Sequence, residues 1–230
     1  LWKQQNIESS VGVKYDKDKL AKVIENLDCM AEENQIPSVS AKPEFTGEKF
    51  EVAAEQIGTA IDKDKFAETV TKAINGFQSE VDLMKEDCYI LPKYTKDSPE
   101  VAEACEKMNS ELGANITLDF SPNTEVVDSS VISQWITVDD NMQVTFNQDA
   151  VKQYIADLAA KYDTVGKTRN FTTATGNVVQ VEGGGYGWKI DQDAEYNALI
   201  TNIQNAETVT REPNYSSRAA THDANDWGTT

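Results

Sequence analysis

The sequence is poor in the side chains from which most enzyme active sites are built. Its 230 residues include one histidine, His222, and three cysteines, Cys29, Cys88 and Cys105. Nucleophilic catalysis needs a positioned base, usually a histidine, and zinc sites need Cys and His at short spacings that are missing here. We therefore expect no catalytic residue, no metal site and no cofactor. His222 lies in a run of small polar residues and is expected to be solvated.

The three cysteines leave two interpretations open. They are either small buried apolar residues, or one disulfide with one thiol to spare. Their spacing does not decide whether Cys88 and Cys105 are joined.

Basic residues are also scarce. The 21 Lys and Arg stand against 39 Asp and Glu, which gives a formal net charge of -18. A protein of this charge lacks the attraction for phosphate that supports most nucleic-acid binding, so we expect no nucleic-acid partner and no binding to anionic membrane surfaces. No apolar run reaches the length of about 18 residues that indicates a membrane span. Apolar residues still make up 39% of the chain, which is enough for a folded core.

The glycine-rich stretch "EGGGYGWKID" matches neither of two common ligand loops. A dinucleotide fingerprint needs glycines at its first, third and sixth positions, and counting from the first glycine puts Trp188 sixth. The aspartate pairs that begin at Asp62 and Asp191 lack the glycine and the glutamate of an EF-hand. We interpret these aspartates as helix N-caps. We interpret Gly187 as a residue that the backbone needs for a positive φ or a bulge.

An internal repeat organises the chain. Residues 57–74 align without a gap with residues 186–203, and the identical positions are Gly58 and Gly187, Ile61 and Ile190, Asp62 and Asp191, Asp64 and Asp193, and Ile74 and Ile203. Three weaker matches accompany this one: residues 13–27 with 144–158, Phe45 with Phe171, and Pro92–Tyr94 with Pro213–Tyr215. Two tandem copies of one module are the simplest explanation.

Each copy shows the same order of patterns. Apolar residues fall at i, i+3, i+4 and i+7 in the first helix of each copy: Leu20, Val23, Ile24 and Leu27, and Val151, Tyr154, Ile155 and Leu158. Residues 49–61 and 177–190 then favour strands, and a second helix follows each. We predict an α+β fold made of two tandem copies of a small module with helices packed on a mostly antiparallel sheet.

A further helix separates the copies. Ser98 is placed as its N-cap, Pro99 as its first residue and Gly113 as its stop. Residues 114–120 then resemble a strand, and residues 126–138 a second strand with a turn of its own. We predict three segments: a first module over 1–98, a second module with the linking helix over 99–215, and a linker towards a further domain over 216–230.

The second copy, from Asp128 to Tyr215, is similar to a known family. Its stretches "YDTVGKTRNF" and "GGGYGWKID" and the closing "PNY" resemble the peptidoglycan-binding domain that precedes the catalytic domain in L,D-transpeptidases of Gram-positive bacteria. The first copy keeps "IGTAID" and "PKY" but has no counterpart of "YDTVGKTRNF". The resemblance implies tandem modules behind an N-terminal membrane anchor, with the catalytic domain C-terminal to Thr230.

The resemblance also bears on activity and location. The catalytic domain of that family carries a Ser/Thr-His-Gly-Cys segment, which this sequence lacks. The chain is therefore expected to be a non-catalytic, extracytoplasmic region of an L,D-transpeptidase, located in the cell envelope and membrane-anchored in the full-length protein.

Four residues are candidates for contact with peptidoglycan, through its glycan strands or its stem peptides. Tyr186 and Trp188 lie two apart on an extended segment and face the same side, where aromatic rings either stack on sugars or pack in a core. Arg169 either pairs with Asp163 to hold its loop or meets a stem-peptide carboxylate. Packing and pairing are the simpler alternatives.

Two functions remain. The chain binds peptidoglycan and docks its parent enzyme on the wall, or it is a structural stalk or protein-interaction module that spaces the catalytic domain from the membrane without glycan affinity. Tandem repetition and strong negative charge suit the second alternative.

Overall fold

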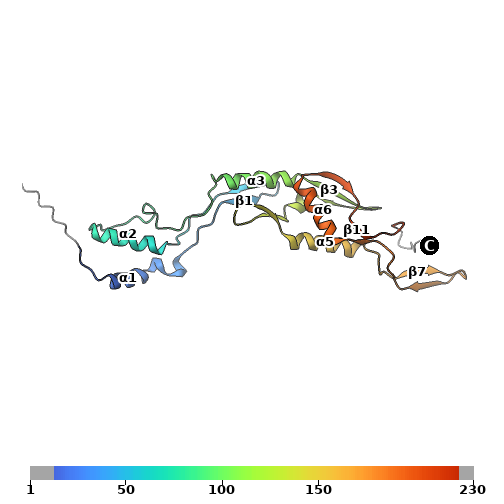
Figure 1. The fold of residues 1–230 in the computed structure, drawn as a ribbon, viewed down its shortest axis with the longest axis horizontal. Coiled ribbons are helices and arrows are strands. Elements are labelled where there is room, and N and C mark those ends of the chain that lie inside the picture. Colours follow the sequence, from blue (N-terminus) through green and yellow to red (C-terminus); the bar gives the residue numbers. More distant parts are fainter. Residues whose placement is uncertain (1–12, 223–230) are drawn as a thin grey trace, which may run out of the picture. The chain divides into compact units, whose positions relative to one another are not determined.

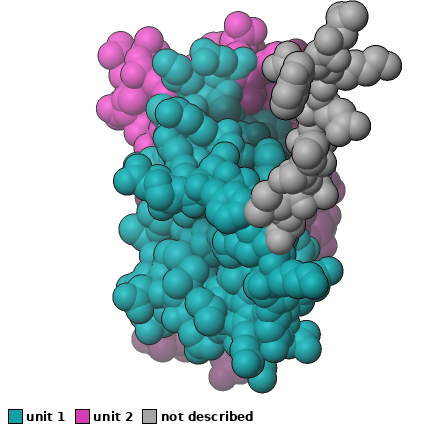
Figure 2. Space-filling view, turned by 90° about the vertical axis from the view of Figure 1, so that its left-hand side faces the viewer, with its two compact units in different colours: residues 1–41, 54–97 teal, residues 42–53, 98–230 magenta. Residues whose placement is uncertain are grey.

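In this computed structural model, residues 13–222 are described. The chain divides into two compact units (Figure 2): unit 1 comprises residues 1–41 and 54–97, and unit 2 comprises residues 42–53 and 98–230. The division does not follow chain order. Residues 42–53 fall inside the predicted first module, yet their packing partners lie in unit 2, more than fifty residues further along the chain. A contact at that separation leaves no trace in a local sequence pattern.

The regular secondary structure described in unit 1 is helical. Its elements are α1 (Lys17–Glu25), the 3-10 turns η1 (Asp28–Met30) and η2 (Glu32–Asn34), and α2 (Lys63–Asn75). The N-cap of α1 is Asp16 and that of α2 is Asp62, whose carboxylate accepts a hydrogen bond from the Lys65 amide at 3.0 Å. The buried core of the unit consists of Ile24, Met30, Ile61, Phe66 and Cys88. Among its described residues, β-pairing is limited to the bridges Val39–Gln56 and Ile61–Tyr89.

Unit 2 holds the larger core and all the strands named in the described residues. Its elements (Figure 1) are β1 (Lys42–Phe45), β2 (Phe50–Ala53), α3 (Pro99–Leu112), β3 (Asn115–Phe120), β4 (Asn123–Val127), α4 (Ser129–Ile132), β5 (Ile136–Val138), β6 (Val144–Phe146), α5 (Gln148–Tyr162), β7 (Arg169–Thr172), β8 (Val178–Val181), β9 (Lys189–Ile190), α6 (Gln192–Gln204), β10 (Thr208–Arg211) and β11 (Tyr215–Ser217). The three-stranded sheet has the order β10-β3-β4, with β10 and β3 parallel and β3 and β4 antiparallel. The other four pairings are antiparallel. The predicted α+β class with mostly antiparallel sheets is confirmed.

The linking helix is also confirmed. It runs from Pro99 to Leu112, with Ser98 as N-cap and Gly113 as C-cap. The side chains of Val101, Met108 and Leu112 are buried, so one face of the helix enters the core, as the apolar spacing requires.

The predicted strand over residues 126–138 is interrupted. β4 ends at Val127, the short helix α4 follows, and β5 begins at Ile136. The Asp128 carboxylate accepts hydrogen bonds from the amide and the hydroxyl of Ser130 at 3.0 and 2.6 Å. This local cap starts a helical turn in place of the expected simple turn.

The two copies share one strand-to-helix junction. Ile61 pairs with Tyr89 in unit 1 as Ile190 pairs with Tyr215 in unit 2. The amide that follows each isoleucine donates to an equivalent carbonyl, Asp62 to Cys88 at 2.9 Å and Asp191 to Asn214 at 2.8 Å. Tyr89 therefore occupies the place of Tyr215. The sequence match of Pro92–Tyr94 with Pro213–Tyr215 is wrong by several residues, because the pairing of main chains sets the register and the prolines take no part in it.

Candidate functional site

The four candidate residues meet at the junction that leads into α6. Gly187 has φ +145°, and a Cβ there would lie 2.7 Å from the Val165 amide nitrogen. Next to it, the Trp188 amide donates to the Thr164 hydroxyl at 2.9 Å and the Trp188 carbonyl accepts from the Thr164 amide at 2.8 Å. The predicted backbone requirement at Gly187 is thus confirmed: the strand approaches too closely for any side chain.

Trp188 is packed within the protein. Only 6% of it is exposed, and its ring stacks on His222 at 4.0 Å between centroids with 5° between planes. Its indole nitrogen donates to the Thr221 carbonyl at 2.8 Å, and the Arg218 guanidinium lies 5.4 Å from the ring. Of the two alternatives, Trp188 is therefore a packing residue, and its ring is not exposed for stacking on a sugar in this structure.

The prediction that His222 is solvated is wrong. Its ring lies on Trp188 and is only partly exposed. The reason is tertiary: the indole offers a large apolar face, and nothing in the polar sequence around His222 indicates that this face is near.

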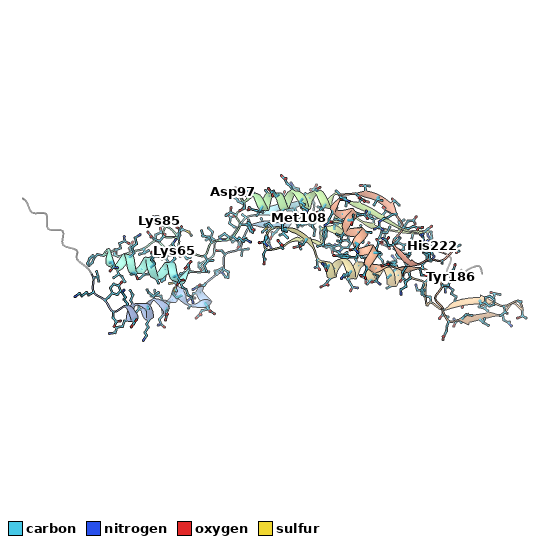
Figure 3. The ribbon with its side chains drawn as sticks, in the orientation of Figure 1. Lys65, Lys85, Asp97, Met108, Tyr186 and His222 are labelled. Atoms are coloured by element: carbon cyan, nitrogen blue, oxygen red, sulfur yellow. The ribbon has the colours of Figure 1, made fainter. Side chains whose placement is uncertain are left out.

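Tyr186 keeps more contact with solvent. Its side chain is half-buried, and its hydroxyl accepts a hydrogen bond from the Ala220 amide at 2.7 Å. Figure 3 shows Tyr186 and His222 close together in the same part of unit 2. The neighbouring Gly184 and Gly185 have open space where a Cβ would be, so a ligand can approach the backbone beside this tyrosine.

Arg169 and Asp163 hold the loop that faces this junction. Arg169 is 8% exposed, and its Nη2 donates to the carbonyls of Thr164 and Tyr186 at 3.2 and 3.3 Å. The Asp163 carboxylate accepts from the Ile190 amide at 2.9 Å. Burial raises the pKa of the Asp163 carboxyl, while that hydrogen bond and the charges of nearby lysines oppose the rise. Both side chains therefore tie loop to strand.

Three partly exposed apolar side chains share one face of the hairpin β7–β8. In its register, Phe171 lies opposite Val179 and Arg169 opposite Val181, so these side chains share one face. Phe171, Val179 and Val181 are 46%, 42% and 39% exposed. The sequence from Asn170 to Val181 holds no charged residue. An uncharged, exposed ribbon is unusual in so acidic a chain.

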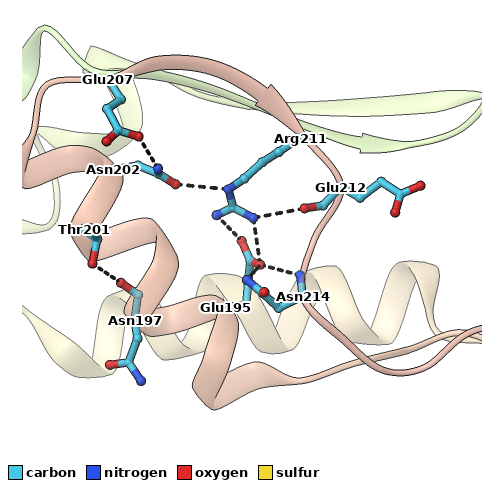
Figure 4. A network of polar contacts seen from close by, with 8 residues as sticks. All are labelled: Glu195, Asn197, Thr201, Asn202, Glu207, Arg211, Glu212 and Asn214. Carbon is cyan, nitrogen blue, oxygen red and sulfur yellow. Dashed lines mark hydrogen bonds and ion pairs between the residues drawn. The ribbon is translucent and has the colours of Figure 1, made fainter.

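A buried ion pair between Glu195 and Arg211, which the sequence analysis did not predict, lies at the end of the second copy (Figure 4). Glu195 is fully buried, and Arg211 donates to both of its carboxylate oxygens, at 3.0 Å from Nη1 and 2.8 Å from Nη2. The amide and the side-chain nitrogen of Asn214 donate to the same carboxylate at 2.7 and 2.9 Å. These bonds fasten the closing "REPNY" segment to α6. The sequence contained one hint of this pair: in the alignment of the repeat, the charged Glu195 matches the apolar Phe66.

A shallow cavity lined mostly by polar residues includes members of this network. Its volume is about 400 Å³, and it is lined by Asn197, Ala198, Thr201, Asn202, Arg211, Glu212 and Asn214. Amide and hydroxyl groups of this kind can bind the hydroxyls and amides of a polar ligand.

The cysteines are all free thiols: Cys29 exposed, Cys88 buried and Cys105 half-buried. The disulfide alternative is therefore wrong in this structure. Within residues 13–222, no cluster of acidic, His and Cys side chains is suited to a metal ion. Over the same range, none of the helices combines the length and the apolar character needed to cross a bilayer.

Known structures resemble the chain in part. One is titled "Structure of the Ldtfm-avibactam carbamoyl enzyme" and another is an L,D-transpeptidase of Enterococcus faecium, a C442S mutant. Each is 30% identical to this chain, with TM-scores of 0.42 and 0.41. The similarity covers 50% of this chain and 46% of each solved chain, so the chain spans about half the length of these structures. No curated protein matches the sequence.

A family comparison covers far more of the chain. The family described as "Putative peptidoglycan binding domain" matches residues 1–82 and 94–211, one stretch in each copy of the repeat. Peptidoglycan as partner and the cell wall as location are what this description implies. With most of its length matched, the chain belongs to this peptidoglycan-binding domain family.

Proposed function

We propose that this chain is the non-catalytic, peptidoglycan-binding region of a cell-wall L,D-transpeptidase and that it docks its parent enzyme on the wall. The family match over both copies carries the proposal. The sequence resemblance from Asp128 to Tyr215 supports the proposed parent, which has an N-terminal membrane anchor, a catalytic domain after Thr230 and an extracytoplasmic location in a Gram-positive bacterium.

Of the four candidate residues, Tyr186 is the proposed ligand contact. It is half-buried, and open backbone at Gly184 and Gly185 lies beside it, which lets a sugar ring approach its face. Asp163, Arg169 and Trp188 are proposed to position this contact, because each is engaged in holding the loop or the strand.

Two positively charged side chains near Asp163 also support the proposed binding surface. Lys167 and Lys189 are exposed, and their charges oppose the rise that burial causes in the pKa of the Asp163 carboxyl. They provide local positive charge in a chain of net charge -18. Stem peptides carry carboxylates, so these lysines are the proposed peptide contacts.

The test is retention on purified sacculi, together with titration of labelled protein by soluble muropeptides. Reversing both lysines (Lys167→Glu and Lys189→Glu) should weaken retention by about tenfold, since each exposed charge pair contributes up to about 1 kcal/mol. Tyr186→Ala should weaken it further. Lys152→Glu, which reverses one charge elsewhere in unit 2, is the control for each single reversal and should leave retention unchanged.

The alternative is the stalk. If the unaltered chain does not pellet with sacculi and shows no shifts at Tyr186, the peptidoglycan-binding proposal is overturned. An unrelated rigid spacer of equal length would then replace both modules without loss of the parent's activity in cells.

A further inference from the structure

The shallow cavity of unit 2 combines neutral polar groups with one guanidinium. Its volume of about 400 Å³ is within the range of known ligand pockets, about 300–1,000 Å³. Asn197, Thr201 and Asn202 line it from α6, and Figure 4 shows Arg211 reaching towards this helix from β10. The Thr201 hydroxyl donates to the Asn197 carbonyl at 2.8 Å, so its oxygen can still accept a hydrogen bond from a ligand.

Arg211 has one N–H group that a ligand can use. A guanidinium has five N–H donors. Nε donates to Asn202 at 3.1 Å, Nη1 to Glu195 at 3.0 Å and to the Glu212 carbonyl at 3.1 Å, and Nη2 to Glu195 at 2.8 Å. The second N–H of Nη2 has no acceptor among residues 13–222. In a planar guanidinium this N–H lies on the same edge as the Nε–H, which is the edge that faces Asn202 in the cavity lining.

The charged groups at the cavity are all paired. Arg211 pairs with Glu195, and the Glu212 carboxylate pairs with Arg218. The other lining residues are neutral, and among them the half-buried Ala198 offers a small apolar contact. An ion would lose its hydration here without gaining a free counter-charge. The cavity therefore favours an uncharged ligand that both accepts and donates hydrogen bonds.

The fold itself does not require the buried charges. The first copy has Phe66 at the position of Glu195, and Phe66 is equally buried, at 5% exposed. Apolar side chains in place of a buried ion pair are often neutral or stabilising. In the second copy, the two bonds from Glu195 fix the guanidinium of Arg211 in the cavity wall. This pair thus positions a donor at the cavity where the first copy has only core packing.

The neutral lining is also specific to the second copy. In the alignment of the repeat, Asn197 matches Glu68 and Thr201 matches Lys72. Both residues of the first copy are exposed and charged. We therefore expect one such ligand site in the chain.

We infer that this cavity binds an uncharged N-acetylated sugar. The acetamido carbonyl accepts from Nη2 of Arg211, the acetamido N–H donates to the Thr201 hydroxyl, and the acetamido methyl packs on Ala198. The amide side chain of Asn197 binds sugar hydroxyls. The inference rests on the proposed function only for the source of the sugar, the glycan strand of peptidoglycan.

Titration of the isotope-labelled 230-residue chain with chitotetraose, a neutral N-acetylated oligosaccharide, tests the inference. Backbone amides of residues 197–202 and 211–214 should shift and saturate as a single site. Cellotetraose has the same length without acetamido groups and should bind at least about tenfold more weakly, since two hydrogen bonds are lost. Because the charges at the cavity are paired, the affinity should change less than about twofold between low and high salt.

Single substitutions at the cavity wall sharpen the test without disturbing the core. Thr201→Val and Asn197→Ala should each weaken chitotetraose binding about fivefold. Thr208→Val makes the same change at an exposed residue of β10 outside the cavity lining, and should leave binding unchanged. The double variant Glu195→Met with Arg211→Leu should keep the amide spectrum of the folded core and abolish binding.

Three results would overturn the inference: no shifts at the cavity, equal affinity for cellotetraose, or stronger binding of N-acetylalanine amide, which would make the site one for peptides. Retention on sacculi, measured separately, decides the proposed function. A chain that pellets with sacculi without chitotetraose shifts at the cavity overturns this inference alone. A chain that binds chitotetraose at the cavity but does not pellet supports this inference and overturns docking on the wall.

Discussion

Units 1 and 2 share the same strand-to-helix junction, but their buried cores differ greatly in size. Ile61 and Ile190 are both 3% exposed, and Gly58 and Gly187 both lie too close to neighbouring backbone for a Cβ. Beyond that junction the units diverge, because the core of unit 2 contains eighteen buried residues and that of unit 1 five.

The difference shows which apolar residues of the repeat are buried only where a further helix or sheet packs on them. Leu27 and Leu158 align in the sequence repeat, yet Leu27 follows the end of α1 and is 38% exposed, whereas Leu158 lies within α5 and is 4% exposed. In unit 2, α3 and β3 to β6 complete the core around α5. The described part of unit 1 has no comparable layer, so its helices keep apolar surface in solvent. The same sequence pattern therefore contributes far more stability in the second unit.

The largest predicted effect concerns the buried ion pair of Glu195 and Arg211, in which Glu195 occupies the position equivalent to Phe66. Arg211→Ala leaves the Glu195 carboxylate buried without its charge partner, which should destabilise unit 2 by about 3–5 kcal/mol. Urea unfolding followed by tryptophan fluorescence measures this, since Trp135 and Trp188 are buried in unit 2.

The double variant Glu195→Met with Arg211→Leu replaces the ion pair by apolar side chains, as unit 1 has the apolar Phe66 at the equivalent position. It should recover at least half of the lost stability, because no uncompensated charge remains. A double variant as unstable as Arg211→Ala would show that the loss comes from packing around Arg211 and not from the orphaned carboxylate.

The equivalent leucines provide the next test. Leu158→Ala should cost about 2–5 kcal/mol, because it opens a cavity in a closed core. Leu27→Ala should cost less than about 1 kcal/mol, because much of that side chain already contacts water. Each loss is measured from the exchange of amides within the affected unit, and equal losses would contradict the contrast between the cores.

The shared junction gives a smaller effect. Gly187→Ala forces a Cβ to within 2.7 Å of backbone at a positive φ, and we expect a cost of about 1–3 kcal/mol. Gly184→Ala is the control in the same loop. It has nothing within 4 Å of the new Cβ, so its thermal midpoint should match that of the parent, and a comparable loss there would refute the steric explanation.

The smallest effect concerns a buried carboxylate in unit 2, that of Glu111. Glu111 is 2% exposed, its carboxylate oxygens have no hydrogen-bond partner, and the Lys107 ammonium lies 3.8 Å away. Burial raises the pKa of Glu111 from its ordinary value of 4.5. The stability that comes from its protonation is therefore present below that value and is lost as the pH rises through the higher folded-state pKa.

Glu111→Gln removes this dependence. The variant should match the parent at low pH and exceed its stability by about 1 kcal/mol at neutral pH. Urea unfolding at several pH values measures the difference. A gap that does not change with pH would mean that Lys107 already compensates the carboxylate.

Local chemistry made several features predictable. Asp16, Asp62 and Asp191 cap helices because a short carboxylate reaches the free amides of the first turn. Gly187 was recognisable because the repeat preserved it among changing neighbours. Such features depend on residues within about one turn of one another, so the sequence by itself determined the helices, their faces and the α+β class.

Tertiary structure decided the rest. The burial of Glu195 against Arg211, the stacking of His222 on Trp188 and the seating of Phe50 on Asn109 all join residues far apart in the chain. Each depends on which surfaces meet after the helices and strands have formed. No local pattern records that choice, because the free energy of each contact comes from desolvation between the two partners and is absent until both are in place.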